Sequence, residues 1–366
     1  MKVVFDAYWW VDGPPSLRHV LREIVRAWDS LYPNDQLTLV VRRSHLEAAA
    51  TDAPRGAVLV PVALWPQALA AAVAAPSAAR AAGADLVLTH NFAAVTRGAL
   101  STVYLHDVLF ATNPEWFTLA ERAYFSLMLR WVHRAELVYT SSESEATRIR
   151  ENSSARVVMP VGLGLSTELT DSGLVELPDP DVRPQRFVLT VGRLNARKNL
   201  GATIDAALAS GLVGRERPLI VVGSADGRRS ALGADAHRAI EQGWVRFAGF
   251  VSEARLRWYY RNASLFVFLS LGEGFGMPPV EAAYFGAPTL VSDLPVFRET
   301  LGGHARFVDP ADRDAVAAAI ARGITEGEAR MLQPATSTAL AARHNWLEAV
   351  RTIRSAAADR LAMVAA

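Results

Sequence analysis

Short apolar runs rich in β-branched residues alternate with segments of helical length along the whole chain, and this alternation limits the fold more than any other feature. The runs are apolar throughout, which is typical of strands buried on both faces of a parallel sheet, so the pattern predicts an α/β fold. The first half of the chain contains KVVF, LTLVV, AVLVPV, DLVLTH, STVYLHD, LVYTS and RVVMPVG. The second half contains FVLTVG, LIVVG, VRFAG, SLFVFLS, PTLVS and ARFVD.

Two such series in 366 residues indicate two domains, since single cores stop growing at smaller sizes. We predict an N-terminal domain over 1–170 and a C-terminal domain over 184–343. The segment 170–185, TDSGLVELPDPDVRPQ, has the proline, glycine and acidic residues of an exposed linker. Residues 344–366 are expected to form one helix that crosses back to the N-terminal domain. Its apolar side comprises Trp346, Leu347, Val350, Ile353, Leu361 and Val364.

Composition excludes several classes of function. The chain has no cysteine, which rules out disulfides, thiolate catalysis and cysteine-bound metals. A net charge of +1 gives no reason to expect binding to nucleic acid. The N-terminus lacks the apolar region of a secretion signal, and proline interrupts the longest apolar window. We therefore expect a cytoplasmic protein, with peripheral membrane contact left open.

The stretch GEGFGMPPVEAAYFGAP (272–288) follows a predicted strand and contains two acids, Glu273 and Glu281, separated by seven residues. Its glycines allow backbone N–H groups to approach a ligand, and its prolines begin a helix without losing a needed donor. Carboxylates accept hydrogen bonds from hydroxyl pairs, as on sugars and riboses. The loop is thus predicted to hold two polyols. The structural alternative is a helix-terminal acid at Glu281 beside an unrelated Glu273.

A second predicted strand, FVLTVG, leads into RLNARKNL. Arg193 and Lys198 in this loop, together with the free N–H groups of a following helix, would form a site for an anion. Two solvated bases on a loop are the alternative interpretation. No acid cluster suited to Mg²⁺ accompanies them, so we expect neither a metal nor another cofactor.

The N-terminal half offers fewer candidates. His106 and Asp107 follow the strand STVYLHD, at the end of the sheet where ligands bind in parallel α/β folds. A histidine with only a structural role is the alternative. Trp9 and Trp10 stand near Gly13 in the first loop, where they could stack on a sugar or belong to the core.

These motifs resemble those of the retaining glycosyltransferases of family 4. The resemblance covers about 101–355 and is most specific over 187–300, in VGRLNARKNL and in the loop with its E-x7-E pattern. It implies the GT-B architecture, in which two Rossmann-like domains with parallel sheets face an interdomain cleft. The N-terminal domain would bind the acceptor, and the C-terminal domain would bind the nucleotide-sugar donor.

The resemblance also assigns roles. Glu273 would contact the transferred sugar and Glu281 the nucleotide ribose, while Arg193 and Lys198 hold the diphosphate. His106 would face the reacting sugar. Further donor contacts are expected from Gly13, Gly192, Phe250, Val251, Gly274, Phe275, Gly276 and Met277, with Phe250 and Val251 near the nucleobase. The first loop departs from the family, since Leu17 stands where a second glycine is usual, and this leaves the acceptor pocket undefined.

The expected activity is metal-independent transfer of a hexosyl or deoxyhexosyl group, with mannose or rhamnose as the candidates. The donor would be a nucleoside-diphosphate sugar, and the acceptor a glycan or lipid-linked glycan of a surface polysaccharide. Two alternatives stay open at this point: an epimerase or phosphorylase of the same fold, and a non-catalytic subunit that binds nucleotide sugars.

Overall fold

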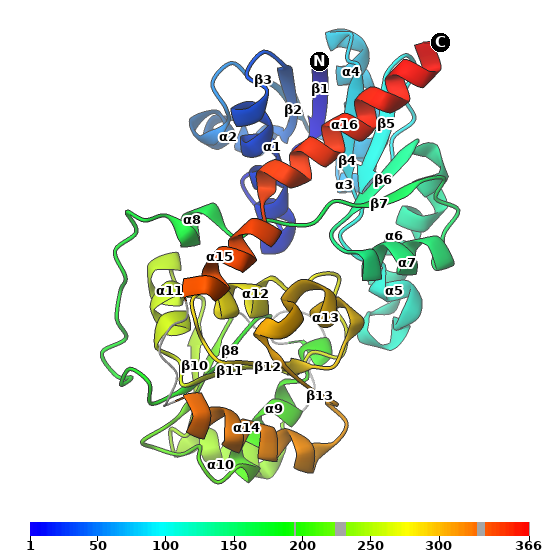
Figure 1. Ribbon diagram of the computed structural model, residues 1–366. Helices are drawn as coiled ribbons and strands as arrows, with labels where there is room; N and C mark the ends of the chain where they lie inside the picture. Colours follow the sequence, from blue (N-terminus) through cyan, green and yellow to red (C-terminus); the bar gives the residue numbers. More distant parts are fainter. Residues whose placement is uncertain (194, 224–231, 328–333, 366) are drawn as a thin grey trace. The chain divides into compact units, whose positions relative to one another are not determined.

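The computed structural model describes residues 1–193, 195–223, 232–327 and 334–365 (Figure 1). The chain forms two compact units. Unit 1 contains Met1–Pro114, Thr118–Gly164 and Asn345–Ala366, and unit 2 contains Glu115–Phe117 and Leu165–His344. Each unit is built on one parallel sheet.

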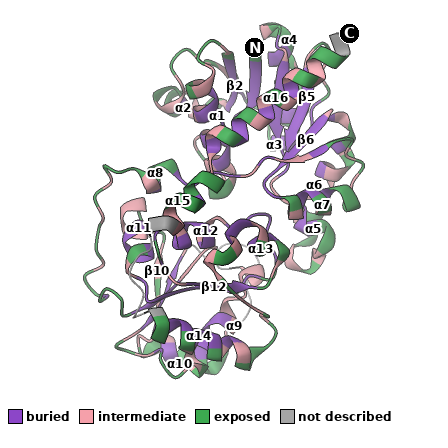
Figure 2. Cartoon of the chain, in the orientation of Figure 1, coloured by how far each residue is buried: buried purple, intermediate pink, exposed green. Residues whose placement is uncertain are grey.

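Unit 1 has a seven-stranded sheet in the order β3-β2-β1-β4-β5-β6-β7. The strands are β1 Lys2–Asp6, β2 Gln36–Arg42, β3 Val58–Val62, β4 Leu86–His90, β5 Leu100–Tyr104, β6 Leu137–Thr140 and β7 Val158–Pro160. Every residue of the central strands β4 and β5 is buried (Figure 2), as expected for strands covered on both faces. The seven apolar runs predicted in the first half are therefore confirmed as strands.

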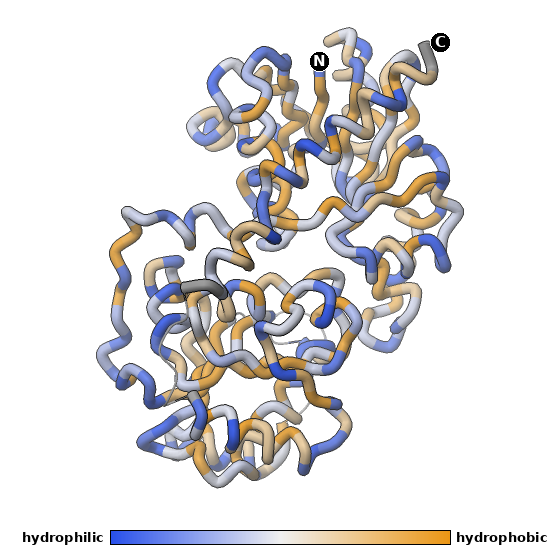
Figure 3. The backbone as a smooth tube through the Cα atoms, in the orientation of Figure 1, coloured by the Kyte–Doolittle hydropathy of each residue, from blue (hydrophilic) through white to orange (hydrophobic). Residues whose placement is uncertain are grey.

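The helices of unit 1 pack against this sheet. They are α1 Pro15–Leu31, α2 Leu46–Asp52, α3 Gln67–Leu69, α4 Ala75–Ala82, α5 Leu109–Thr112, α6 Leu119–Trp131, α7 Glu143–Asn152 and α16 Trp346–Ala365. The apolar colouring in Figure 3 follows the strands, while polar residues lie on the outer sides of the helices. On α4 small alanines, including Ala75, Ala78 and Ala79, allow the helix to pack closely on Val4 and Val87.

The C-terminal helix α16 packs on α1 in unit 1 (Figure 1). Trp346, Val350 and Ile353 are buried there. The Tyr139 hydroxyl donates to the Ile353 carbonyl over 3.1 Å. Arg354 donates to both carboxylate oxygens of Asp35 over 2.8 and 3.1 Å. The helix is therefore held by an apolar face and by polar bonds at its border.

Unit 2 has a six-stranded sheet in the order β10-β9-β8-β11-β12-β13. The strands are β8 Val188–Val191, β9 Leu219–Val222, β10 Val245–Gly249, β11 Leu265–Phe268, β12 Thr289–Ser292 and β13 Arg306–Val308. They correspond to the six runs predicted in the second half. The helices are α8 Thr167–Thr170, α9 Leu200–Ala209, α10 Ala234–Glu241, α11 Glu253–Asn262, α12 Met277–Tyr284, α13 Pro295–Leu301, α14 Arg313–Gly327 and α15 Pro334–Arg343.

The segment that was predicted as an exposed linker makes specific contacts in unit 2. Arg257 of α11 is buried and donates to the Asp171 carbonyl over 2.6 Å and to the Leu174 carbonyl. The Tyr259 hydroxyl donates to the Asp179 carboxylate. A buried guanidinium needs carbonyl acceptors, and this segment supplies them to Arg257. Unit 2 begins at Leu165, ahead of the predicted boundary at 170.

Candidate functional site

Each sheet has one point at which the strand order reverses. In unit 1 the reversal lies between the neighbouring strands β1 and β4, and in unit 2 between β8 and β11. The connections leave such a pair of strands in opposite directions, which opens a crevice at the carboxyl ends of the strands where ligands of these folds bind. The residues that follow these four strands are therefore the first candidates.

The loop after β8 begins at Gly192, whose φ of +152° favours glycine. A Cβ atom there would lie 3.4 Å from Cε of Lys198. The Asn195 side chain accepts from the Lys198 N–H over 3.2 Å and caps a short 3₁₀ helix, Ala196–Lys198. This turn directs two successive cations, Arg197 and Lys198, toward the loop after β11.

The Glu273 carboxylate receives both cations. Its Oε1 lies 2.6 Å from Nζ of Lys198, and its Oε2 lies 2.5 Å from Nη1 of Arg197. The Ser270 hydroxyl adds a bond of 2.6 Å to Oε1. We call Arg197, Lys198 and Glu273 the charged cluster. The loop of β8 is thus joined to the loop of β11 at the switch point of unit 2.

Burial and ion pairing act against each other in the charged cluster. Burial alone would raise the pKa of Glu273, but the two cations and the hydrogen bonds outweigh it and lower this pKa to about 2. Burial lowers the pKa of Lys198 to about 8, although Glu273 opposes the shift. The positive charges of Arg197 and Arg193 contribute to the lowered pKa. Two cations beside one carboxylate leave a surplus positive charge for an anion.

The sequence prediction for this loop included Arg193 and Lys198 but missed Arg197. The structure pairs Arg197 with Glu273 and also with the Gly272 carbonyl over 2.7 Å. Only its position beside Lys198 in the sequence could have suggested a role. Arg193 is half-buried in the same loop.

The loop from Gly274 to Met277 is shaped by close packing. Gly276 has a φ of +92°, and a Cβ atom there would lie 2.4 Å from Cε1 of Phe297. The Phe275 ring is buried edge-on against His344, with centroids 5.4 Å apart. The Phe275 side chain therefore belongs to the core, and its backbone is what the loop offers to a ligand. Met277 begins α12 and is half-buried.

Glu281 has a different environment from that of Glu273. It is buried on α12 and accepts from the Tyr260 hydroxyl over 3.0 Å. Burial raises the pKa of Glu281 to about 7, and the negative charge of Glu253 adds to the shift. Tyr260, which lies on α11, was not predicted. The two acids of the loop thus differ in protonation: Glu273 is ionised, while Glu281 titrates near neutral pH.

Phe250 and Val251 follow β10. Phe250 is 78% exposed, an unusual position for an aromatic ring, and Val251 is half-buried. Gly249 just before them has a φ of +66°. An exposed ring after a strand is available for stacking, while the nucleobase contact at Phe250 and Val251 is predicted from the family resemblance.

In unit 1 two histidines meet at the carboxyl ends of the central strands. His90 is the last residue of β4, and His106 follows β5. His90 Nδ1 lies 3.2 Å from His106 Nε2, and the rings stack with centroids 5.4 Å apart at 28°. Burial lowers the pKa of His90 to about 3 and that of His106 well below its ordinary value. This histidine pair is therefore neutral at pH 7. His90 was not predicted.

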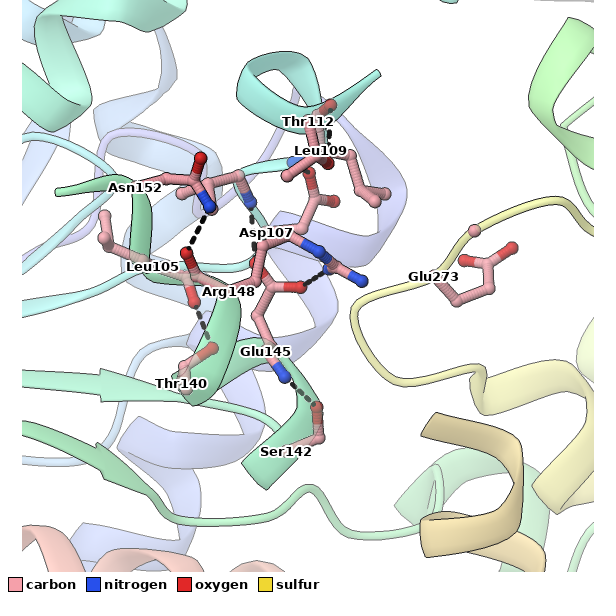
Figure 4. A network of polar contacts seen from close by, with 12 residues as sticks. Leu105, Asp107, Leu109, Thr112, Thr140, Ser142, Glu145, Arg148, Asn152 and Glu273 are labelled. Atoms are coloured by element: carbon pink, nitrogen blue, oxygen red, sulfur yellow. Dashed lines mark hydrogen bonds and ion pairs between the residues drawn. The ribbon is translucent and has the colours of Figure 1, made fainter. Parts of the chain in front are cut away.

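A buried carboxyl holds the turn that carries His106 (Figure 4). Oε1 of Glu145 on α7 accepts from the Val108 N–H over 2.8 Å, and Arg148 forms an ion pair with the same carboxylate. Ser142 caps α7 by accepting from the Glu145 N–H over 3.0 Å. Burial, together with the charge of Asp107, raises the pKa of Glu145 to about 8. The helix start thus anchors the strand end that bears His106.

Trp9 and Trp10 of the first loop, predicted either to stack on a sugar or to belong to the core, have different environments. Trp10 is 1% exposed and belongs to the core. Trp9 is half-buried, and its Nε1 donates to Gln67 Oε1 over 2.9 Å. Gly13 has a φ of +124°, and a Cβ atom there would lie 2.3 Å from the Trp9 ring. Gly13 is therefore required by its packing on Trp9.

Over the described ranges, no group of three or more histidine, aspartate or glutamate side chains is arranged to hold a metal ion. Within the same ranges, no helix has the length and apolarity needed to span a bilayer.

Two Rossmann-like units, each with a parallel sheet, define the GT-B class of folds. The chain aligns over its full length with sucrose-phosphate synthase from Thermosynechococcus elongatus, with a TM-score of 0.73 and 19% identity, and it covers 100% of that chain. It also aligns over 98% of its length with Anabaena HepE in complex with UDP and glucose, with a TM-score of 0.66 and 19% identity, covering 100% of that chain. At these identities the likeness concerns the fold.

Residues 180–335, most of unit 2, match the family described as glycosyl transferases group 1. The chain is 28% identical over 265 residues to O-antigen chain mannosyltransferase B from Escherichia coli, covering 70% of this chain and 69% of the relative. It is 26% identical over 234 residues to the serotype-specific mannosyltransferase WbdA from Escherichia coli. That match covers 60% of this chain and 29% of WbdA.

Proposed function

We propose that the protein is a retaining, metal-independent hexosyltransferase that moves mannose from a nucleoside-diphosphate sugar to a hydroxyl of a glycan or lipid-linked glycan in the synthesis of a surface polysaccharide. The charged cluster at the switch point of unit 2 is the observation that carries the proposal. Mannose is preferred to rhamnose because the two curated relatives are described as mannosyltransferases.

The reaction requires stabilisation of negative charge on the departing diphosphate. Lys198 lies 2.6 Å from Glu273, and its pKa is lowered. A diphosphate that binds beside Lys198 would be a second anionic partner for this ammonium group. Arg197 retains the second oxygen of Glu273, which keeps this carboxylate ionised and oriented when Lys198 turns to phosphate. Arg193, in the same loop, would contact the diphosphate as well. Fixed cations of this kind stabilise a transition state without reorganisation.

The two acids would bind the two ends of the donor. Glu273, ionised beside the cations, would accept hydrogen bonds from hydroxyls of the transferred sugar. Glu281 on α12 would accept from the ribose, with Tyr260 fixing its carboxyl group. Phe250 and Val251 would lie against the nucleobase. Backbone groups of Gly192, Gly274 and Gly276 would approach the phosphates and the sugar.

The bond changes balance without a carboxylate nucleophile. The bond between the anomeric carbon and the leaving phosphate oxygen breaks, and the acceptor oxygen attacks from the same face. The acceptor hydroxyl proton passes to the departing phosphate oxygen. His106 would contact the reacting sugar or the acceptor. This route retains the anomeric configuration, and it places the proton on the product nucleotide.

The first test is nucleotide binding followed by transfer. Thermal shifts with GDP, UDP, dTDP and ADP identify the nucleotide, because a ligand of the native state raises the unfolding temperature. The matching sugar nucleotide is then incubated with a lipid-linked glycan acceptor, and NMR of the product gives the anomeric configuration. We expect the configuration of the donor to be kept and EDTA to leave the rate unchanged. Inversion, or loss of activity that Mg²⁺ restores, would contradict the corresponding part of the proposal.

The same assay separates the competing functions. Donor consumption that does not need an acceptor would indicate an epimerase or a phosphorylase of this fold. Nucleotide binding without turnover over a broad acceptor panel would indicate a non-catalytic subunit.

A further inference from the structure

The hydrogen bond between His90 and His106 in unit 1 limits which ring nitrogens carry protons. His90 Nδ1 and His106 Nε2 are 3.2 Å apart, so one nitrogen carries the proton and the other accepts it. The Tyr104 ring packs on both imidazoles, with centroids 5.8 Å from His90 and 4.9 Å from His106. Both rings are neutral at pH 7, since burial lowers their pKa values. A neutral pair has two arrangements, which differ in the nitrogen that carries each proton.

The second nitrogen of His90 distinguishes the two arrangements. His90 Nε2 is buried and has no hydrogen-bond partner among the described residues. If His90 Nδ1 accepted the bond, Nε2 would carry a proton and would be a buried donor without an acceptor. If His90 Nδ1 donates, Nε2 holds only a lone pair. In protein backbones a buried N–H without an acceptor is rarer than an under-satisfied carbonyl acceptor, and the same order applied to the ring nitrogens favours the second arrangement.

We propose that His90 is a positioning residue that donates Nδ1–H to Nε2 of His106 and thereby holds His106 in the tautomer protonated at Nδ1. His106 then presents an N–H donor to an oxygen of its ligand and no basic nitrogen, because its acceptor site is occupied by His90. Under the proposed function this ligand oxygen is a sugar hydroxyl. His106 thus orients the sugar by donation and does not remove a proton.

Hydrogen bonds around His90 hold its backbone, and thus the base of its side chain, in place. The Gln67 side-chain amide donates to the His90 carbonyl over 3.1 Å and to Asp6 over 2.9 Å. Gln67 in turn accepts from Trp9 Nε1. His90 ends β4 and Asp6 ends β1, the two strands that flank the switch point of unit 1. The position of the ring therefore depends on the sheet itself and on a buried amide.

The direct test reads the tautomers in the free protein. Protein labelled with ¹⁵N-histidine is examined at pH 7 by long-range ¹H–¹⁵N correlation, and the signals are assigned with His90→Asn and His106→Asn. We expect His106 to be protonated at Nδ1 with an acceptor-type Nε2, and His90 to be protonated at Nδ1. A His106 protonated at Nε2, or an imidazolium at either position, overturns the inference.

Substitutions add a kinetic readout. His90→Asn keeps an N–H donor near the position of Nδ1, whereas His90→Leu removes it. In His90→Asn we expect the Nδ1–H tautomer of His106 to persist and kcat to stay within a factor of about three. In His90→Leu we expect a mixture of His106 tautomers and a kcat about tenfold lower with little change in KM, the loss of roughly one hydrogen bond. His133→Leu, at an exposed histidine of unit 1, is the control.

The results separate this inference from the proposed function. The tautomer spectrum is recorded without substrate, so a protein that transfers no sugar can still support or contradict the role of His90. A transferase with the wrong His106 tautomer would contradict the inference and leave the function intact. Equal kcat losses in His90→Asn and His90→Leu, with an unchanged tautomer in both, would show that His90 has only a packing role. If His90→Leu does not fold, the wild-type spectrum and His90→Asn still decide.

Discussion

The two switch points place opposite kinds of chemistry around one buried residue each, His90 in unit 1 and Glu273 in unit 2. Unit 1 presents the histidine pair, which is neutral, and unit 2 presents the charged cluster, in which Glu273 stays ionised. Burial acts against charge in both units. The difference lies in the partners: Glu273 has two cations within 2.6 Å, while no carboxylate bonds to the histidine pair among the described residues. Burial therefore does not determine charge by itself, because a counter-ion within bonding distance reverses its effect.

The largest effect is expected from removing the shared counter-ion. Glu273→Gln leaves the half-buried Arg197 and Lys198 beside a buried neutral amide, and breaking a buried ion pair costs up to about 3–5 kcal/mol. We expect a matching loss in the free energy of unfolding of unit 2, measured in urea, and a sharp loss of transfer. Affinity for the bare nucleoside diphosphate should be nearly unchanged, because Glu273 is expected to contact the sugar and not the nucleotide.

An exposed ion pair in the same unit supplies the control. Glu216 pairs with Arg183 over 3.2 Å, and both side chains are at least 80% exposed. Glu216→Gln should change stability by less than about 1 kcal/mol. Equal loss of nucleotide affinity and transfer in Glu273→Gln would place this acid at the nucleotide.

The next effect concerns turnover. Lys198→Ala removes a cation from the departing diphosphate and should lower kcat by about 10² or more. Folding should persist, because Arg197 still pairs with Glu273. Steady-state kinetics of Lys198→Ala and Arg193→Ala are compared with those of Arg183→Ala. Full activity in Lys198→Ala would remove the charged cluster from the mechanism.

A smaller effect is expected in the pH dependence of stability, where Glu145 of unit 1 and Glu273 of unit 2 have opposite signs. The folded pKa of Glu145 is raised from 4.5 to about 8, so its contribution to stability is complete below pH 4.5 and is lost as pH rises to about 8. Glu273 has the opposite sign: its contribution is present above pH 4.5 and is lost as pH falls to about 2. Glu145→Gln should therefore gain stability relative to the wild type as pH rises from 5 to 8.

Thermal unfolding over this pH range provides the measurement. Glu143→Gln, at an exposed position on the same helix, should leave the pH profile unchanged. Parallel profiles for Glu145→Gln and the wild type would contradict the raised pKa.

The smallest effect is expected at Glu281. Its pKa is raised to about 7, so the carboxylate that would accept from the ribose forms as pH rises through neutrality. Affinity for the nucleoside diphosphate should increase from pH 6 to 8 in the wild type more than in Glu281→Gln, and at pH 8 the variant should bind about tenfold more weakly. Calorimetry at both pH values measures this. Normal binding of nucleotide and donor by Glu281→Gln would refute the ribose contact.

Local patterns in the sequence were sufficient for the architecture. Apolar runs such as DLVLTH and SLFVFLS became strands because a strand buried on both faces needs little beyond continuous apolar side chains. Patterns within one loop likewise placed Lys198 and Glu273 after strands. Most residues of the predicted linker are exposed, but the bonds of Arg257 to this segment were not predicted, since they depend on a helix far along the chain.

What the amino-acid sequence determined by itself was the set of strands, the residues that follow them and hence the chemical groups available at each switch point. The tertiary structure alone decided which of these groups meet and whether they are charged. Arg197 and Glu273 are 76 positions apart, and His90 and His106 are 16 apart. Parallel strands become neighbours only through crossover connections, so side chains at their ends are paired by strand order and not by local sequence. Protonation follows from the same pairing, because it depends on the nearest partner and on the exclusion of water.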